Sequence, residues 1–291
     1  MMNFIDGDEL LTLCEKENKK ISEIMLEREV QLFKTTKEEA LAKMRHSYEI
    51  MKHAVKRALT EDLKSMGGLL GGESKRIYAR SGTGKTACGH MMTKAISYAV
   101  GTLEVNSSMG LIVAAPTAGS SGVIPGVLIA LQEEFNYSEE EMLMALFNAG
   151  AVGYVITRNA TVSGAEGGCQ AEIGSASAMA ASAACELMGG SPRASLDAAA
   201  TALSNILGLV CDPIAGLVEA PCQKRNAMGV SNALVSAEMA LSGLAHIIPF
   251  DETVEAMYKV GCSMPMELRE TAMGGVAATK TACELCKGIL S

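Results

Sequence analysis

The 291-residue sequence contains no tryptophan, and aromatic residues make up only 4% of it. A core without large rings must be built from small and aliphatic side chains, which supply most of the 48% of hydrophobic residues. β-Branched runs are scarce and methionines number 19, and both features favour helix over strand. We predict an all-α fold, a compact bundle of mostly buried small-residue helices with glycine- and proline-rich active-site loops.

Clustered positive charge is also missing, since 25 Lys and Arg against 33 Asp and Glu give a net charge of −8. The lone basic run, Lys224-Arg225, is too short for a phosphate backbone, which argues against nucleic acid. The most apolar window, residues 109–131, is broken by prolines and glycines, whereas a membrane span needs about 20 apolar residues. The acidic first residues do not resemble a secretory signal. We expect a cytoplasmic protein with no membrane partner.

The stretch SGTGKT, residues 81–86, ends like a phosphate-binding P-loop. That pattern requires a glycine five residues before Gly84, but Ala79 stands there. The preceding residues are polar and basic, whereas a buried hydrophobic strand should lead into such a loop. We therefore interpret this stretch as a loop that enters a helix, and nucleotide hydrolysis is not expected.

The pattern of charge divides the chain into two parts. Residues 1–65 combine dense charge with apolar residues at helical spacing, which predicts one or two long amphipathic helices packed on the core. Residues 66–291 begin with a glycine-rich break and continue with uncharged runs of alanine, glycine and serine. We expect this second part to be a buried helical catalytic domain.

Four breaks between the predicted helices have unusual content: residues 106–126, 163–172, 208–226 and 272–281. Their glycines and prolines free backbone N–H groups, and their serines, threonines and asparagines add short hydrogen-bond donors. Such loops inside an apolar bundle are where a binding site is expected.

Nine cysteines is an odd number, which does not suit a complete disulfide framework. Cys169, Cys211 and Cys222 lie in the breaks, whereas Cys185 lies in an alanine-rich helix. Their spacing is not that of a zinc knuckle, so spacing alone favours buried structural thiols over ligands. If they do bind metal, soft thiolates suit zinc or an iron–sulfur cluster. Three thiolates would leave one iron of a [4Fe–4S] cluster open to a substrate hydroxyl.

Four stretches carry a resemblance to a known family: SSMGLIVAAPTAGSSGVIPGVL, GGCQAEIGSASAMAA, GLVCDPIAGLVEAPCQKRNAMG and LRETAMGGVAAT. In this order they resemble the catalytic chain of iron–sulfur-dependent L-serine dehydratase, over residues 65–280. The resemblance implies a [4Fe–4S] cluster held by Cys169, Cys211 and Cys222. It implies deamination of L-serine to pyruvate and ammonia, in amino-acid degradation and gluconeogenesis. The open iron would activate the serine hydroxyl, so pyridoxal phosphate would not be needed.

The resemblance also gives roles to the other loops. The substrate carboxylate would be held by Pro116, Thr117, Ala118, Gly119, Ser120 and Ser121, with help from Asn106. The candidate catalytic residues are Lys75, Ser107, Ser108, Thr117 and Ser120. Lys75, beside Gly67-Gly68 and Gly71-Gly72, would offset substrate charge. In the alternative interpretation, residues 116–121 only join two helices, and residues 106–108 only cap one.

Single-chain members of that family carry a small additional domain with a serine- and histidine-bearing motif, and nothing similar is present here. His46 and His53 lie on the charged helix, and His90 and His246 have no carboxylate partner in sequence. The chain therefore resembles an alpha subunit, and we expect a hetero-oligomer with a separate beta subunit that supplies a histidine.

Some relatives end in a cysteine that reaches the cluster. Cys283 or Cys286 could be such a fourth ligand, a redox pair, or two thiols on a last helical turn. Two other functions stay open: an L-cysteine desulfidase-like lyase, and an iron–sulfur sensor without turnover. The sequence does not identify the general base, or the preference among serine, threonine and cysteine.

Overall fold

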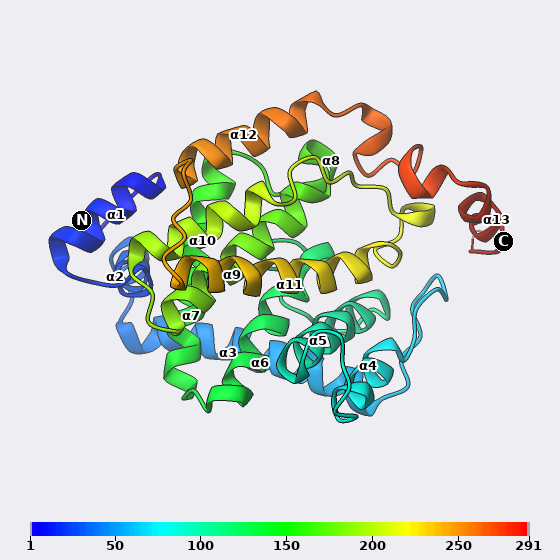
Figure 1. Cartoon of the computed structure of the whole chain (residues 1–291), viewed down its shortest axis with the longest axis horizontal. Helices are drawn as coiled ribbons and strands as arrows, with labels where there is room; N and C mark the ends of the chain where they lie inside the picture. Colours follow the sequence, from blue (N-terminus) through cyan, green and yellow to red (C-terminus); the bar gives the residue numbers. More distant parts are fainter. Residues whose placement is uncertain (1, 290–291) are drawn as a thin grey trace.

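The computed structural model describes residues 2–289, and these contain thirteen α-helices and no strand (Figure 1). The predicted all-α fold is therefore confirmed. The helices are α1 Gly7–Glu17, α2 Ile21–Phe33, α3 Lys37–Thr60, α4 Glu73–Ser81, α5 His90–Ser107, α6 Val123–Phe135, α7 Glu139–Asn159, α8 Gly164–Gly167, α9 Ser175–Leu187, α10 Pro192–Ser204, α11 Cys222–Leu241, α12 Phe250–Ser263 and α13 Lys280–Ile289.

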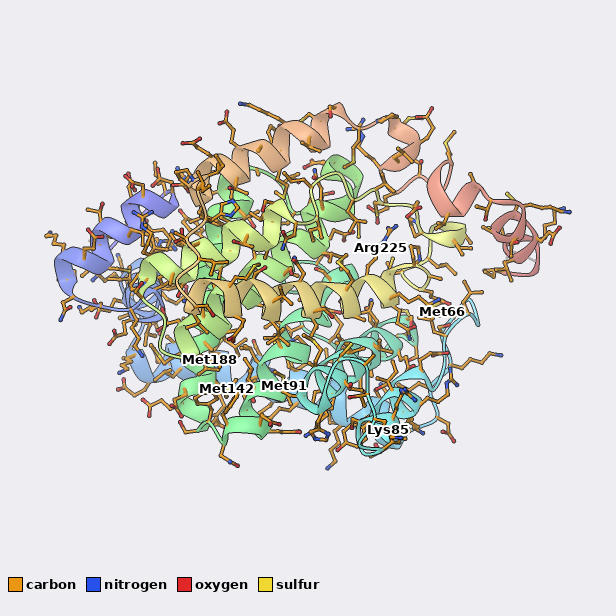
Figure 2. All side chains as sticks on the ribbon, in the orientation of Figure 1. Met66, Lys85, Met91, Met142, Met188 and Arg225 are labelled. Carbon is orange, nitrogen blue, oxygen red and sulfur yellow. The ribbon has the colours of Figure 1, made fainter. Side chains whose placement is uncertain are left out.

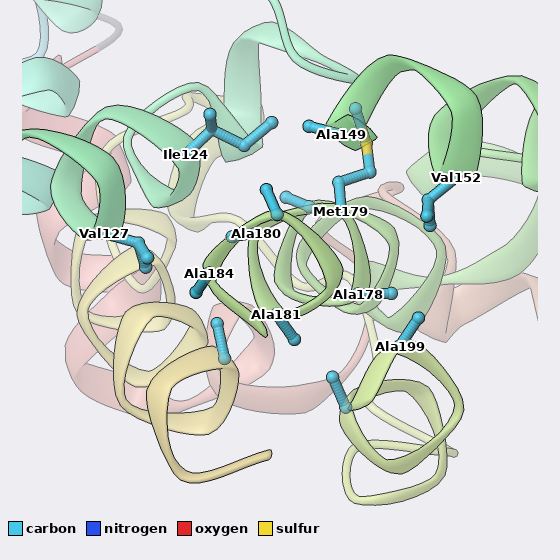
Figure 3. Packing of buried hydrophobic residues seen from close by; sticks show 14 of the residues in the cluster. Ile124, Val127, Ala149, Val152, Ala178, Met179, Ala180, Ala181, Ala184 and Ala199 are labelled. Atoms are coloured by element: carbon cyan, nitrogen blue, oxygen red, sulfur yellow. The ribbon is translucent and has the colours of Figure 1, made fainter. Parts of the chain in front are cut away.

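Helix α9 forms the centre of the bundle, with α6, α7, α10 and α11 packed around it. Its sequence SASAMAASAACEL is buried from Ser175 to Glu186, because alanine and serine let neighbouring helices approach closely. Figure 3 shows Ala178, Ala180 and Ala181 pointing in different directions from α9 toward its neighbours. The small residues of the sequence thus build the core, as predicted.

The first 65 residues form three helices, rather than the one or two that we predicted. Asn18 and Lys34 adopt the left-handed conformation that ends α1 and α2, and the Asp6 and Thr36 side chains cap the starts of α1 and α3. These helices pack on the others through α1–α10, α2–α7 and α3–α5 contacts, and their apolar residues belong to the main core. A division into two units at residue 65 stays a prediction.

Helices α5 and α6 cross at close range because glycine lies at the crossing. A Cβ atom on Gly122 would lie 2.3 Å from the Ala99 carbonyl oxygen, and one on Gly126 would lie 2.9 Å from that of Ala95. This contact fixes the start of α6, and with it the end of the segment 106–126.

Two ambiguous windows of the sequence lie in loops. Residues 111–116, LIVAAP, are irregular, and SGTGKT joins the end of α4 to the loop before α5. A helix therefore precedes Lys85 where a P-loop would have a strand, and Figure 2 shows Lys85 at the surface. Among residues 2–289, no helix is both long and apolar enough to cross a bilayer.

Candidate active site

The three loop cysteines meet near the amino-terminal end of α11. Cys169, Cys211 and Cys222 are buried, with 4%, 3% and 8% of their surface exposed, and all are free thiols. Proximity to Cys169 is the first cause of the raised pKa of Cys211, and it adds to burial in raising the pKa of Cys222. Thiols separated by 42 and 11 residues in the sequence are thus brought to one place by the fold.

Cys169 is positioned by the residue that follows it. The Gln170 side chain donates to the Met257 carbonyl oxygen at 2.8 Å and accepts the Gly208 amide at 2.8 Å. The Gln170 amide also donates to the Leu209 carbonyl oxygen at 2.9 Å. Gln170 begins a π-helical turn, Gln170–Gly174, a feature that occurs often at functional sites. The Cys169 loop is therefore fastened both to α12 and to the segment before Cys211.

Cys211 is held by the segment that follows α12. Its amide donates to the Leu268 carbonyl oxygen at 2.8 Å, and its carbonyl accepts the Glu270 amide at 2.7 Å. The next residue, Asp212, accepts the Val276 amide at 2.6 Å. The stretch LRETAMGGVAAT thus holds the Cys211 loop in place through hydrogen bonds of its backbone, and we call it the backbone clamp.

Cys222 is tied to the glycine-rich loop through Glu219, a residue that the sequence analysis missed. The Glu219 carboxylate is 2% exposed and accepts the Ser65 hydroxyl at 2.6 Å, the Gly67 amide at 2.6 Å and the Leu69 amide at 3.1 Å. The loop predicted to help with substrate is therefore anchored against the segment before Cys222. Lys75 points elsewhere, because its ammonium pairs with Asp62 at 2.5 Å.

The predicted substrate loop reaches the thiols through a second missed residue, Glu172. The Thr117 hydroxyl donates to Glu172 at 2.7 Å, and the Cys211 sulfur lies 3.7 Å from the other carboxylate oxygen. Glycine leaves room for this carboxylate, since a Cβ on Gly119 or Gly164 would lie 3.0 or 2.6 Å from it. Burial raises the pKa of Glu172, and the bond from Thr117 partly offsets the effect. Glu172 therefore stands between the substrate loop and Cys211.

A third missed residue, Asn226, joins the substrate loop to α11. Its side-chain amide donates to the carbonyl oxygens of Gly119 at 2.7 Å and Cys222 at 2.9 Å, and its oxygen accepts the Gly122 amide at 3.0 Å. Asn226 is fully buried, so these bonds have no competition from water. One side chain thus sets the spacing between the substrate loop and Cys222.

The predicted polar residues near α5 and in the substrate loop divide into two groups. The Asn106 side chain donates to the Ala118 carbonyl oxygen at 3.2 Å, and thus contacts the loop. Ser107 and Ser108 donate to the carbonyl oxygens of Leu103 and Val105 in their own helix, at 2.7 and 3.1 Å, and a catalytic role for them stays a prediction. Within the loop, Ser120 lies 3.1 Å from the Thr117 hydroxyl, and Ser121 bonds Ala118 at 2.8 Å.

Histidine lies outside this site in the described chain. His46, His53 and His90 are exposed, and His246 faces the Thr201 hydroxyl at 3.2 Å. Cys283 is exposed and Cys286 is half-buried on α13, which packs on the segments Ile214–Gly216 and Gly275–Ala278. A role for either cysteine as fourth ligand stays a prediction.

The donor chemistry of the site was compared with the needs of a metal group. Among residues 2–289, no three His, Cys, Asp or Glu side chains surround a point where a single ion would sit. A cluster differs because each cysteine binds its own iron, so the three sulfurs need not converge on one point. Burial raises the pKa of Cys222 to about 12, and a hydrogen bond to Cys169, with burial, raises that of Cys211. Three buried thiols fit an iron–sulfur cluster, which binds them as thiolates.

The fold and this site together define an all-α protein whose buried thiol centre lies among glycine-rich loops. Residues 16–277 match the family model described as "Serine dehydratase alpha chain". The chain is 50% identical to the probable L-serine dehydratase alpha chain of Bacillus subtilis, over 98% of this chain and 95% of that one. It is 45% identical to the L-serine dehydratase alpha chain of Peptoniphilus asaccharolyticus, over 97% of both. This chain belongs to the serine dehydratase alpha chain family, which confirms the resemblance found in the sequence.

A longer relative is also similar. The L-serine dehydratase of Streptomyces coelicolor is 35% identical over 96% of this chain, but the match covers only 62% of that protein. The remaining part of that relative therefore has no match in this 291-residue sequence.

Proposed function

We propose that this chain is the catalytic alpha chain of an L-serine dehydratase, an ammonia-lyase that converts L-serine to pyruvate and ammonia. The observation that carries the proposal is the convergence of Cys169, Cys211 and Cys222 beside the loop 116–121, in a chain of this family. The relatives named alpha chains and the longer relative all carry L-serine in their names, which favours serine over cysteine as the substrate of this chain.

Cys169, Cys211 and Cys222 are the residues that would hold a [4Fe–4S] cluster. When bound, such a cluster supplies a Lewis-acidic iron that makes a hydroxyl a better leaving group. Pyridoxal phosphate is not required for a reaction activated in this way. The free thiols of the chain suit a reducing compartment, and we place the reaction in the cytoplasm.

The polar loop supplies the substrate contacts in this proposal. Ser120, with the backbone of Ala118 and Gly119, would hold the substrate carboxylate. Thr117 would join them by turning its hydroxyl proton from Glu172 to the substrate, and Asn106 supports the loop. Glu172 orients the Thr117 hydroxyl through their 2.7 Å bond. Pro116 and Ser121, at the two ends of the loop, would complete the set of substrate-binding residues.

A beta subunit completes the site in our proposal. Each described histidine lies outside the thiol site, so an imidazole that transfers the proton would come from a partner chain. The relatives of similar length are named alpha chains, and a longer relative has additional sequence. Both facts support a hetero-oligomer in which the partner contributes the histidine.

The test is anaerobic reconstitution of the chain with iron and sulfide, followed by iron and sulfide analysis and spectroscopy with and without L-serine. Cys169→Ser, Cys211→Ser and Cys222→Ser should each lose the cluster signal. Cys185→Ser is the matched control, because Cys185 is also fully buried but lies inside α9. An iron-free wild-type chain, or a signal indifferent to L-serine, would refute the proposal. Comparison of pyruvate release from serine and cysteine separates the two lyases.

A further inference from the structure

Arg225 is a buried cation that the proposed chemistry does not use. It lies in the first turn of α11, three residues after Cys222, and only 14% of its side chain is exposed. Figure 2 shows Arg225 near the amino-terminal end of α11, among the loops. A guanidinium buried to this degree requires fixed partners, since burial of an unpaired charge is costly.

Two of those partners flank Cys211. One guanidinium nitrogen forms an ion pair with Asp212 at 2.7 Å, and the other donates to the Val210 carbonyl oxygen at 2.8 Å. Asp212 in turn accepts the Val276 amide at 2.6 Å, so it is itself fixed by the backbone clamp on the Cys211 loop. Arg225 thus binds the residues on either side of Cys211.

The third partner is Cys169. Burial lowers the pKa of Arg225, but the charges of Cys169 and Asp212 and hydrogen bonds to both outweigh burial, so the net shift is upward. Arg225 is therefore close to Cys169, bonds both neighbours of Cys211 in the sequence, and shares a helical turn with Cys222.

The charge balance of the site makes this contact important. When a metal group is bound, the three cysteines bind as thiolates, and the buried Asp212 adds a negative charge beside Cys211. Arginine stays protonated throughout the physiological range, so Arg225 offsets part of this charge at all relevant pH values. Outer residues that hold and neutralise metal ligands influence both metal affinity and redox potential.

We propose that Arg225 is a positioning residue that holds the three thiolates in one arrangement and tunes the reduction potential of the group they bind. This inference rests on the proposed iron–sulfur centre and goes beyond it by assigning a function to Arg225. Because reduction adds negative charge, a nearby fixed cation favours the reduced form. Removal of the cation should therefore lower the reduction potential.

The experiment compares Arg225→Gln, Arg225→Lys and the control Lys224→Gln in the full chain, reconstituted anaerobically. Lys224 is the adjacent exposed residue, so its variant removes the same charge from the surface. The measurements are iron and sulfide per chain, the rate of iron release to a chelator, and the midpoint potential. Arg225→Gln should release iron about 10- to 100-fold faster than wild type and have a more negative potential.

Arg225→Lys keeps the positive charge but cannot bind Asp212 and the Val210 carbonyl oxygen at the same time. It should therefore keep the wild-type midpoint potential while releasing iron faster than wild type. Lys224→Gln should match wild type in both measurements. If Arg225→Gln does not fold, by circular dichroism, the release rate of Arg225→Lys decides the question. Release and potential equal to wild type in the folded Arg225 variants would overturn the proposal. Failure of the wild-type chain to take up iron would instead overturn the proposed function.

Discussion

Substitution of Glu219 tests whether the glycine-rich loop is held in place by one carboxylate. Glu219→Ala removes three hydrogen bonds, from the Ser65 hydroxyl and from the amides of Gly67 and Leu69. Hydrogen bonds to a charged group contribute about 1.5–3 kcal/mol each. Water can reach the two amides, because Gly67 and Leu69 are only half-buried, whereas Ser65 is 5% exposed. We therefore expect a loss of about 2–4 kcal/mol in the free energy of unfolding.

Glu219→Gln separates the effect of shape from that of acceptor chemistry. The amide keeps the size of the carboxylate, but its NH₂ group must face either the Gly67 amide or the donors of Ser65 and Leu69. Its cost should lie between that of Glu219→Ala and wild type, at about 1–2 kcal/mol. Urea unfolding measures the free energy, and hydrogen exchange of residues 64–72 measures the local opening.

Glu238→Ala is the control, because Glu238 is exposed on α11, the helix that follows Glu219. We expect it to lie within about 0.5 kcal/mol of wild type and to leave exchange in residues 64–72 unchanged. If Glu219→Ala behaves like this control, the anchoring of the glycine-rich loop by Glu219 is wrong.

The remaining predictions concern packing and pH. Gly126→Ala should lower the free energy of unfolding by about 1–3 kcal/mol, because its Cβ would meet α5 and α11 atoms at 2.9 Å. Gly150→Ala should raise the free energy of unfolding by about 0.5–1 kcal/mol, because the nearest atom to its Cβ would lie 4.0 Å away. If urea unfolding shows that both substitutions change the free energy in the same direction, the packing argument is wrong. Burial, then hydrogen bonding to Glu73, raises the pKa of Glu104 to about 7, above its unfolded value of about 4.3. The stability that this group contributes is thus present below about pH 4 and lost as the pH rises through 7. Glu104→Gln should therefore flatten the pH dependence of the free energy of unfolding between about pH 4 and 7. An unchanged slope would refute this prediction.

The helical bundle was predictable because its signal is local. Alanine and serine at helical spacing with almost no charge mark α9 as a buried helix, whichever neighbours surround it. The number of helices in the first 65 residues was not predictable in the same way. The breaks occur at Asn18 and Lys34, which are single residues in the left-handed conformation, and Lys34 carries no sequence signal for that conformation.

The candidate site was predictable only in part. Cysteines in glycine-rich loops are visible in the sequence, and their resemblance to a family marked them as ligands. Glu172, Glu219 and Asn226 were missed because their partners lie 55, 152 and 107 residues away. A signal was available for Glu172 and Glu219, since each is a carboxylate in an otherwise uncharged stretch, whereas Asn226 directly follows Gln223, Lys224 and Arg225. Such residues must find buried partners, although the sequence does not say which ones.

In the proposed reaction, this chain alone would bind the cluster and the substrate, whereas proton transfer would require a second chain. The thiols, the Gln170 fastening and the Asn226 and Glu219 bonds all come from this one chain, so its cluster site needs no partner in order to form. The proposed proton-transferring histidine, by contrast, would come from the beta subunit, since the described histidines lie outside the thiol site. The isolated chain should therefore bind iron and respond spectroscopically to L-serine, yet produce pyruvate only after a beta subunit is added. Turnover by the isolated, reconstituted chain would show that its own residues carry the proton, and Glu172 would then be the first candidate.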